Sequence, residues 1–162
     1  MLNCIKESLS KILNLQENYA DSRVDRRKGV GGTQEFFTPY ELVCKMCDKV
    51  PKEKWLDPDA LFLEPCFGDG AFIVEILRRR IQDYNINWKQ TLETTFGVEL
   101  MPDNVEQCHN RVIRLLQELK VPDFDEKVAR QIMQENLVCS DFFKWDFENW
   151  KPLPSNESIE LF

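Results

Sequence analysis

The sequence predicts an α/β fold with about three parallel strands flanked by helices, equivalent to half of a doubly wound sheet. Short apolar segments with the length of buried strands alternate with longer segments whose apolar residues recur at helical spacing. Each of the three strand segments has an acidic residue at or near its end, and the first is also followed by two glycines. Because ligands bind beyond the carboxyl ends of the strands in such sheets, the sequence places a binding site there.

The length and composition set limits on function. The 162 residues fit one compact domain with short extensions, and 43% hydrophobic residues are enough to build a core. A formal net charge of −7 argues against a module that holds nucleic acid by neutralising phosphates, so contact with DNA is expected to be weak or indirect. The sequence shows no membrane span and no signal peptide, which predicts a cytoplasmic protein with no membrane partner.

Four regions are expected along the chain. Residues 1–20 carry apolar residues at helical spacing and predict an N-terminal helical arm. Residues 21–32 contain four basic residues and three glycines, which predicts a loop; a solvated linker and a basic strip that touches nucleic acid both fit it. Residues 33–150 are expected to form the main domain, and residues 151–162 a flexible tail rich in Pro, Ser, Asn and Glu.

The first helix of the main domain is expected to start with a capping box. Thr38 can serve as the N-cap, Pro39 as the first helical residue and Glu41 as the third. The helix is expected to stop at Pro51. One continuous apolar face is predicted from Leu42, Val43, Met46, Cys47 and Val50.

The first strand is expected within residues 60–63 and leads into the sequence EPCFGDG. Its glycines, Gly68 and Gly70, let the backbone pass close beneath a ligand where a side chain would block it. A Gly-x-Gly turn alone is a weak signal, but this one follows a strand and opens a helix, which is the context that gives it meaning. That helix is expected to end at arginines 78–80, where positive charge suits a helix C-terminus.

The second and third strands complete the pattern. The second is expected over residues 94–100, and Asp103 is expected to cap the helix that follows it. A further helical segment, residues 125–133, precedes the third strand at residues 136–139, which ends close to Asp141. Polar groups from three strand ends are therefore expected at one edge of the sheet.

The cysteines are interpreted as small core residues of a reducing compartment. Cys44 and Cys47 have a spacing that metal sites use, and the second half of such a site could only be Cys108 and His109. We favour two buried thiols over zinc, because cysteines at i and i+3 on an amphipathic helix more often face the core. No metal site is predicted.

The strand ends favour a ligand that carries an amino group and a ribose. The glycine turn has no Lys or Arg to hold a phosphate, and Ile73 stands where a dinucleotide fingerprint has its third glycine, which argues against NAD and FAD. Glu99 is placed to accept two ribose hydroxyls, and Asp141 could accept from an exocyclic amine. S-adenosylmethionine has these groups together with a cationic amino-acid tail.

Four motifs resemble the N-terminal half of the adenine-N6 DNA methyltransferases in which the F-x-T-P motif precedes the glycine motif. This group occurs in phages and restriction-modification systems. The motifs are EFFTP at 35–39, EPCFGDG at 64–70, GVEL at 97–100 and SDFF at 140–143. Four motifs in the right order are more specific than any one of them. The resemblance covers about residues 33–147 and implies a partial Rossmann-like methyltransferase fold in the cytoplasm, of the host if the chain is phage-encoded.

The resemblance also implies roles for single residues. Phe37 and Thr38 would line the methionine end of S-adenosylmethionine, Glu64 with Gly68 and Gly70 its amino-acid tail, Glu99 the ribose and Asp141 the adenine ring. Taken one at a time, Thr38 with Pro39 would also serve as a plain helix start, and Glu99 or Asp141 as an ordinary helix cap.

The acceptor loop of those enzymes is not found in this sequence. They transfer the methyl group with an Asn-Pro-Pro-Tyr or Asp-Pro-Pro-Tyr loop, whereas no Pro-Pro occurs here. We therefore assign no catalytic residue and expect adenine-N6 methylation to need a partner chain. The first strand would also be left as an unpaired apolar edge, which a partner, a second copy or the N-terminal helix could cover.

Two other functions stay open. The chain could be a non-catalytic binding module that engages the DNA sliding clamp or a host restriction-modification enzyme. Leu161 and Phe162 resemble the terminal Leu-Phe of peptides that dock on the clamp, although for so short a motif we favour packing of both on the chain's own surface. An enzyme that degrades S-adenosylmethionine would need an acid or base near the sulfonium, for which Asp69, Glu64 and Tyr40 are the candidates.

Overall fold

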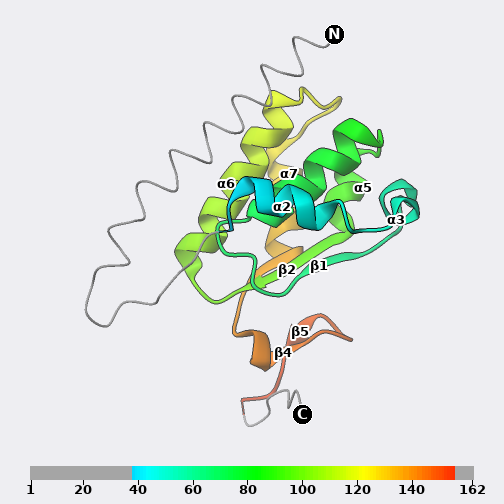
Figure 1. The fold of residues 1–162 in the computed structure, drawn as a ribbon. Coiled ribbons are helices and arrows are strands. Elements are labelled where there is room, and N and C mark those ends of the chain that lie inside the picture. Colours follow the sequence, from blue (N-terminus) through cyan, green and yellow to red (C-terminus); the bar gives the residue numbers. More distant parts are fainter. Residues whose placement is uncertain (1–37, 156–162) are drawn as a thin grey trace.

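Three parallel strands form the sheet at the centre of the fold (Figure 1). The structure is a computed structural model that describes residues 38–155. The strands are β1 (Phe62–Glu64), β2 (Thr95–Glu99) and β3 (Leu137–Cys139), and they lie side by side in that order. The predicted α/β class with three parallel strands is confirmed.

Some of the predictions lie outside the described residues. They are the helical arm at 1–20, the basic loop at 21–32, Phe37, and the terminal pair Leu161 and Phe162.

Six α-helices accompany the sheet within residues 38–155. They are α2 (Tyr40–Cys47), α3 (Lys52–Leu56), α4 (Ala71–Arg78), α5 (Trp88–Glu93), α6 (Pro102–Glu118) and α7 (Glu126–Asn136), and α4 continues as the π-helix η2 (Arg79–Asp83). The short helices α3 and α5 were not anticipated from the sequence. None of the described helices has the length and hydrophobicity needed to cross a bilayer.

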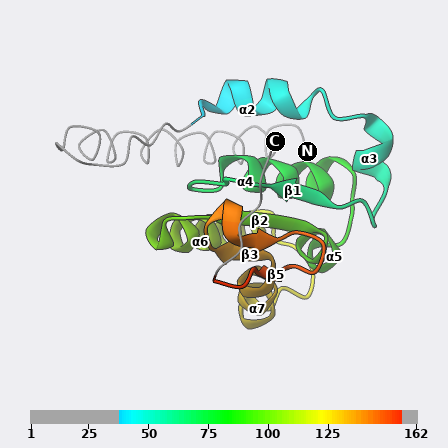
Figure 2. The ribbon, with the colours of Figure 1, turned by 90° about the horizontal axis from the view of Figure 1, so that it is seen from below.

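The two faces of the sheet are covered differently (Figures 1 and 2). Helices α4, α5, α6 and α7 lie on one face, as expected when right-handed crossovers proceed in one direction across a sheet. After β3 the chain passes through the 3-10 helix η3 (Phe142–Lys144) into an antiparallel hairpin on the other face, β4 (Trp145–Asp146) and β5 (Lys151–Pro152). Residues 151 and 152, expected to open the tail, are thus paired with β4.

The core has two parts. The larger cluster fills the space between the sheet and helices α4 to α7, with Ile73, Leu77 and Leu116 fully buried. A smaller cluster packs α2 and α3 against α4 through Val43, Cys47, Trp55 and Ile76. Helix α2 is therefore attached to the outside of α4 rather than to the sheet (Figure 2).

Helix α2 departs from its expected start and face. It begins at Tyr40, its N-cap residue is Pro39, and no side chain makes the cap hydrogen bond, so the predicted capping box with Thr38 is wrong. Only Val43 and Cys47 of α2 are buried, whereas the side chains of Leu42 and Met46 are 47% and 50% exposed. The predicted single apolar face is thus divided.

The two later helices, α6 and α7, start with different caps. Asp103 lies in the first turn of α6, where its charge suits the helix dipole, but the N-cap residue is Met101. Asp125 caps α7, and its carboxylate accepts hydrogen bonds from the backbone N–H groups of Lys127 and Val128.

Helix α4 ends at Arg78, the first residue of the expected arginine run, but the chain stays helical as the π-helix η2 to Asp83. The side chains of residues 78–80 turn inward instead of meeting solvent at a terminus. Arg80 is 0% exposed; it donates to Thr94 Oγ1 at 2.6 Å and to the backbone carbonyls of Asp57 and Pro58 at 3.1 and 2.9 Å. It therefore joins α4 to the loop before β1.

Replacement of Arg80 by methionine should lower the free energy of unfolding by about 2–3 kcal/mol, because buried carbonyl groups lose a charged donor. Arg130→Met is the matched control, since Arg130 lies on the surface of α7 in an i,i+4 pair with Glu126 that is worth under about 1 kcal/mol. Urea denaturation of both variants measures the difference. Equal losses would contradict the structural role of Arg80.

Candidate functional site

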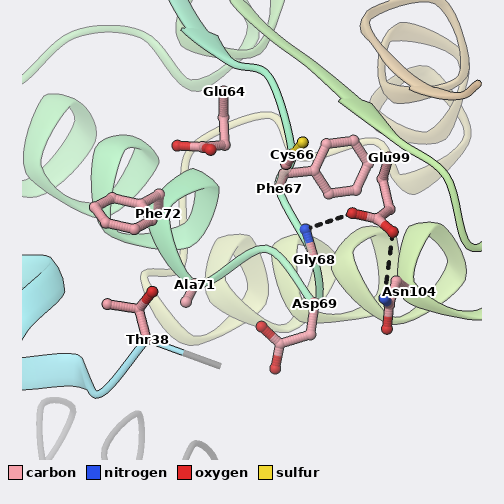
Figure 3. A pocket seen from close by; sticks show the side chains of 10 residues that line it. All are labelled: Thr38, Glu64, Cys66, Phe67, Gly68, Asp69, Ala71, Phe72, Glu99 and Asn104. Atoms are coloured by element: carbon pink, nitrogen blue, oxygen red, sulfur yellow. Dashed lines mark hydrogen bonds between the residues drawn. The ribbon is translucent and has the colours of Figure 1, made fainter. Parts of the chain in front are cut away.

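A cavity of about 270 Å³ opens at the carboxyl ends of β1 and β2 (Figure 3). Ligand pockets usually measure roughly 300–1,000 Å³, so this one is near the lower limit. It is lined by Thr38, Glu64, Cys66, Phe67, Gly68, Asp69, Ala71, Phe72, Glu99 and Asn104. Five residues that the sequence singled out are thus brought together from three separate segments: Thr38, Glu64, Gly68, Asp69 and Glu99.

The glycine turn has a backbone that requires glycine. Gly68 and Gly70 have φ angles of +53° and +86°, in the left-handed region that other residues rarely adopt. A Cβ on Gly70 would also collide with Sγ of Cys108 on α6. Gly70 is not among the lining residues, and its role is the close approach of the turn to α6.

An ion pair fixes the same turn from the side of α6. Arg111 Nη1 lies 2.8 Å from Asp69 Oδ1 and also donates to the backbone carbonyl of Asp69 at 2.9 Å. Both side chains are almost fully buried. Asp69, one of the candidate acids for degradation chemistry, is therefore held in a structural pair.

Glu99 holds the site together from the end of β2. Its Oε2 accepts the Gly68 N–H at 2.8 Å, and its Oε1 accepts the Met101 N–H at 2.9 Å and the Asn104 amide at 3.4 Å (Figure 3). A carboxylate offers about four acceptor positions, so about one is left for a ligand. Acceptance of two ribose hydroxyls would require the long Asn104 contact to give way.

Glu64 points into the cavity from the end of β1 (Figure 3). Burial raises the pKa of its carboxyl above the usual value, and a hydrogen bond with the backbone of Cys66 offsets part of this effect. Glu64 forms no ion pair within residues 38–155. A cation in the cavity would favour its ionised form, because opposite charges at short distance stabilise each other.

The lining has an acidic character. Three carboxylates contribute to it, whereas none of the lining residues within 38–155 is Lys or Arg. Such a site suits a cationic group better than a phosphate, since phosphates are usually held by Lys or Arg side chains. Phe67 and Phe72 supply apolar surface beside the carboxylates.

Asp141 lies away from this lining. It follows β3, and its side chain accepts the Phe143 N–H at 2.9 Å, which caps the 3-10 helix η3. The Ser140 N–H donates to the backbone carbonyl of Glu99 at 2.9 Å and so fixes the start of this segment beside β2. The capping role that the sequence left open for Asp141 is the one the structure displays.

Some lining residues were not singled out from the sequence for the site. Cys66 and Phe67 lie within the turn motif. Ala71 and Phe72 belong to the first turn of α4, and their position directly after the glycines is the sequence signal that could have assigned them to the site. Asn104 is 2% exposed and comes from α6; its contact with Glu99 has no local sequence signal.

The cysteines and the histidine do not form a shared site in the described part of the chain. Among residues 38–155, no group of three or more His, Cys, Asp or Glu side chains could hold a metal ion. Cys47 packs in the cluster under α2, whereas Cys108 lies beneath the glycine turn. His109 Nε2 is 3.1 Å from the carbonyl oxygen of Leu137.

Comparisons of the chain with protein families, with curated proteins and with solved structures found no match. The chemistry of the cavity therefore carries the functional argument.

The replacement Glu99→Gln should lower the free energy of unfolding by about 1–3 kcal/mol, because the amide NH2 group cannot accept from a buried N–H. Glu93→Gln on α5 is the matched control and should change stability by less than about 0.5 kcal/mol, since Glu93 is half exposed in a long surface pair with Lys89. Chemical denaturation of both variants provides the comparison. A Glu99→Gln protein as stable as the control would refute the role of this carboxylate.

Proposed function

We propose that the chain is a cytoplasmic S-adenosylmethionine-binding protein of the methyltransferase type, with a partial Rossmann-like fold. By its motifs it resembles phage and restriction-modification adenine-N6 DNA methyltransferases, and we propose that it needs a partner chain for methyl transfer. The observation that supports this most is the acid-lined cavity at the strand ends, where Glu64 and Glu99 flank a glycine turn with positive φ angles.

The lining residues fit the chemical groups of S-adenosylmethionine. Glu64 would hold the cationic ammonium of the amino-acid tail, and the backbone at Gly68 allows that tail to approach closely. Glu99 would accept a ribose hydroxyl with its remaining acceptor position. Thr38 and Phe72 would complete the wall on the side of the methionine.

When bound, S-adenosylmethionine supplies an electrophilic methyl group on a positively charged sulfur. The residues of this chain would bind and orient the molecule, and the acceptor amine, an adenine N6 by the resemblance, would be presented by another chain.

The sheet offers a place for such a partner. In the described residues β1 forms one edge of the sheet, and Leu61 and Leu63 are 72% and 49% exposed. After β3 the chain forms the hairpin β4–β5 on the other face and does not add a strand next to β1 (Figure 1). Exposed strand edges with apolar side chains are sites where another strand adds.

Degradation of S-adenosylmethionine has weaker support. Asp69 is paired with Arg111, and the Tyr40 hydroxyl donates to Glu75 at 3.1 Å, so two of the three candidate acids or bases have structural partners.

Calorimetric titration tests the proposal. S-adenosylmethionine and S-adenosylhomocysteine should bind the wild-type chain, and Glu64→Gln should weaken binding of both by roughly 10- to 100-fold, because a charge-assisted hydrogen bond to the ammonium is worth about 1.5–3 kcal/mol. Glu93→Gln is the matched control and should bind like the wild type.

Absence of binding by a folded wild-type chain would refute the proposal, and equal binding by Glu64→Gln would place the ligand elsewhere. In the same preparation, the chain alone should transfer no labelled methyl group to unmethylated DNA. Transfer by the chain alone would contradict the need for a partner.

Binding should also be linked to protons. Burial raises the pKa of Glu64 in the free protein, so part of its carboxyl is protonated at mildly acidic pH, and a bound ammonium favours ionisation. Binding near pH 5 should therefore release protons, and the affinity should rise as the pH increases toward 7. Calorimetry in two buffers of different ionisation enthalpy measures this release, which Glu64→Gln should abolish. Proton uptake on binding would contradict the assignment.

A further inference from the structure

The segment just before helix α2 contributes Thr38 to the wall of the cavity, and α2 itself lies outside the sheet. Thr38, which lines the cavity, stands two residues before Tyr40, the first residue of α2 (Figure 3). The position of this wall therefore depends on how α2 is attached to α4. Its apolar contribution is small, since only Val43 and Cys47 of α2 are buried.

A charge cluster centred on the buried Glu75 makes the remaining attachment, and it reaches the surface at Asp48. We call it the Glu75 cluster; its members are Glu75, Arg78 and Arg79 from α4 and η2, and Tyr40, Cys44 and Asp48 from α2 and its C-cap. Glu75 is 1% exposed and accepts from the Tyr40 hydroxyl at 3.1 Å, from Arg79 Nε at 2.6 Å and from Arg78 Nε at 2.9 Å. One carboxylate thus collects donors from both helices.

Arg79 extends the attachment along α2. Its Nη1 donates to the Asp48 carboxylate at 2.7 Å, and its Nη2 donates to the backbone carbonyl of Cys44 at 3.0 Å. Helix α2 is therefore held at its first residue, at its middle and at its C-cap by the single pair of Glu75 and Arg79. Three separate points fix the direction of a helix as well as its distance.

The same helix α4 serves the cavity and the cluster. Ala71 and Phe72 in its first turn line the cavity, and Glu75 follows one turn later. Glu75 itself is not a lining residue, so it has no direct contact with a ligand. A change at Glu75 would reach the ligand through Tyr40 and α2.

The protonation states agree with this arrangement. Burial alone would raise the pKa of Glu75, but hydrogen bonds and charges of Arg78 and Arg79 outweigh it and lower the pKa, so the carboxylate is ionised at neutral pH. Burial and the charge of Glu75 both raise the pKa of Tyr40, so its hydroxyl remains a donor.

We propose that Glu75 is a positioning residue: it fixes α2 on α4 and thereby sets the place of Thr38 in the wall of the cavity. For the identity of the ligand this inference rests on the proposed function. For the attachment of α2 it does not.

Hydrogen exchange of the ligand-free chain tests the attachment. Tyr40→Phe removes one hydroxyl from the cluster and should speed amide exchange in residues 40–47 at least tenfold, while the amides of β2 keep their rates. Tyr84→Phe is the matched control, because Tyr84 packs in the same small cluster, stacked on Trp55, and it should leave exchange in α2 unchanged. Glu75→Gln should act more strongly than Tyr40→Phe.

Ligand affinity tests whether the attachment of α2 affects the cavity. S-adenosylmethionine should bind the Tyr40→Phe protein roughly 3- to 10-fold more weakly than it binds the wild type or Tyr84→Phe. Unchanged exchange in residues 40–47 would overturn the inference, as would faster exchange with unchanged affinity.

If the wild-type chain binds no S-adenosylmethionine, the proposed function fails, and exchange alone decides whether Glu75 fixes α2. If Glu75→Gln does not fold, Tyr40→Phe carries the test, because it keeps the ion pairs between Glu75 and its arginines.

Discussion

The hydrogen bond from the Gly68 N–H to the Glu99 carboxylate is the contact on which the cavity depends. It joins the turn after β1 to the end of β2, while the other oxygen of Glu99 accepts the Met101 N–H at the start of α6. One buried side chain thus sets the relative position of two turns. Because the φ angle of Gly68 is positive, the turn can present its N–H inward without a side chain in the way.

The half-sheet explains why the site is open. Helices lie on one face of the sheet and only a short hairpin on the other (Figure 2). At the β1 edge, Leu61 and Leu63 therefore remain exposed to solvent. A parallel strand is normally buried on both faces, so β1 lacks the environment that its sequence suits. The proposed partner would supply that environment next to Glu64, at the same end of the strand as the cavity. Partner binding and ligand binding would then share one edge of the sheet.

The sequence was sufficient to predict those parts of the fold and of the site that are determined by neighbouring residues. The strands lie within about two residues of their expected bounds, because apolar runs followed by glycine or acid mark both the strand and its end. The cavity residues Glu64, Gly68 and Glu99 could be predicted for the same reason. The position of Asp141 outside the described lining could not, since the distance between one strand end and its neighbours is set by packing.

Local sequence patterns could not predict the contacts between segments that are distant in sequence. Positive charge at residues 78–80 suggested a helix end, yet Arg80 meets carbonyl groups more than 20 residues earlier, at Asp57 and Pro58. The partners of Glu75 on α2 are equally remote in sequence. Buried charges of this kind add little net stability, but each has few arrangements that satisfy all its donors. In a small fold with one face partly uncovered, Glu75, Asp69 and Arg80 therefore fix orientations that apolar packing alone would leave free to slide.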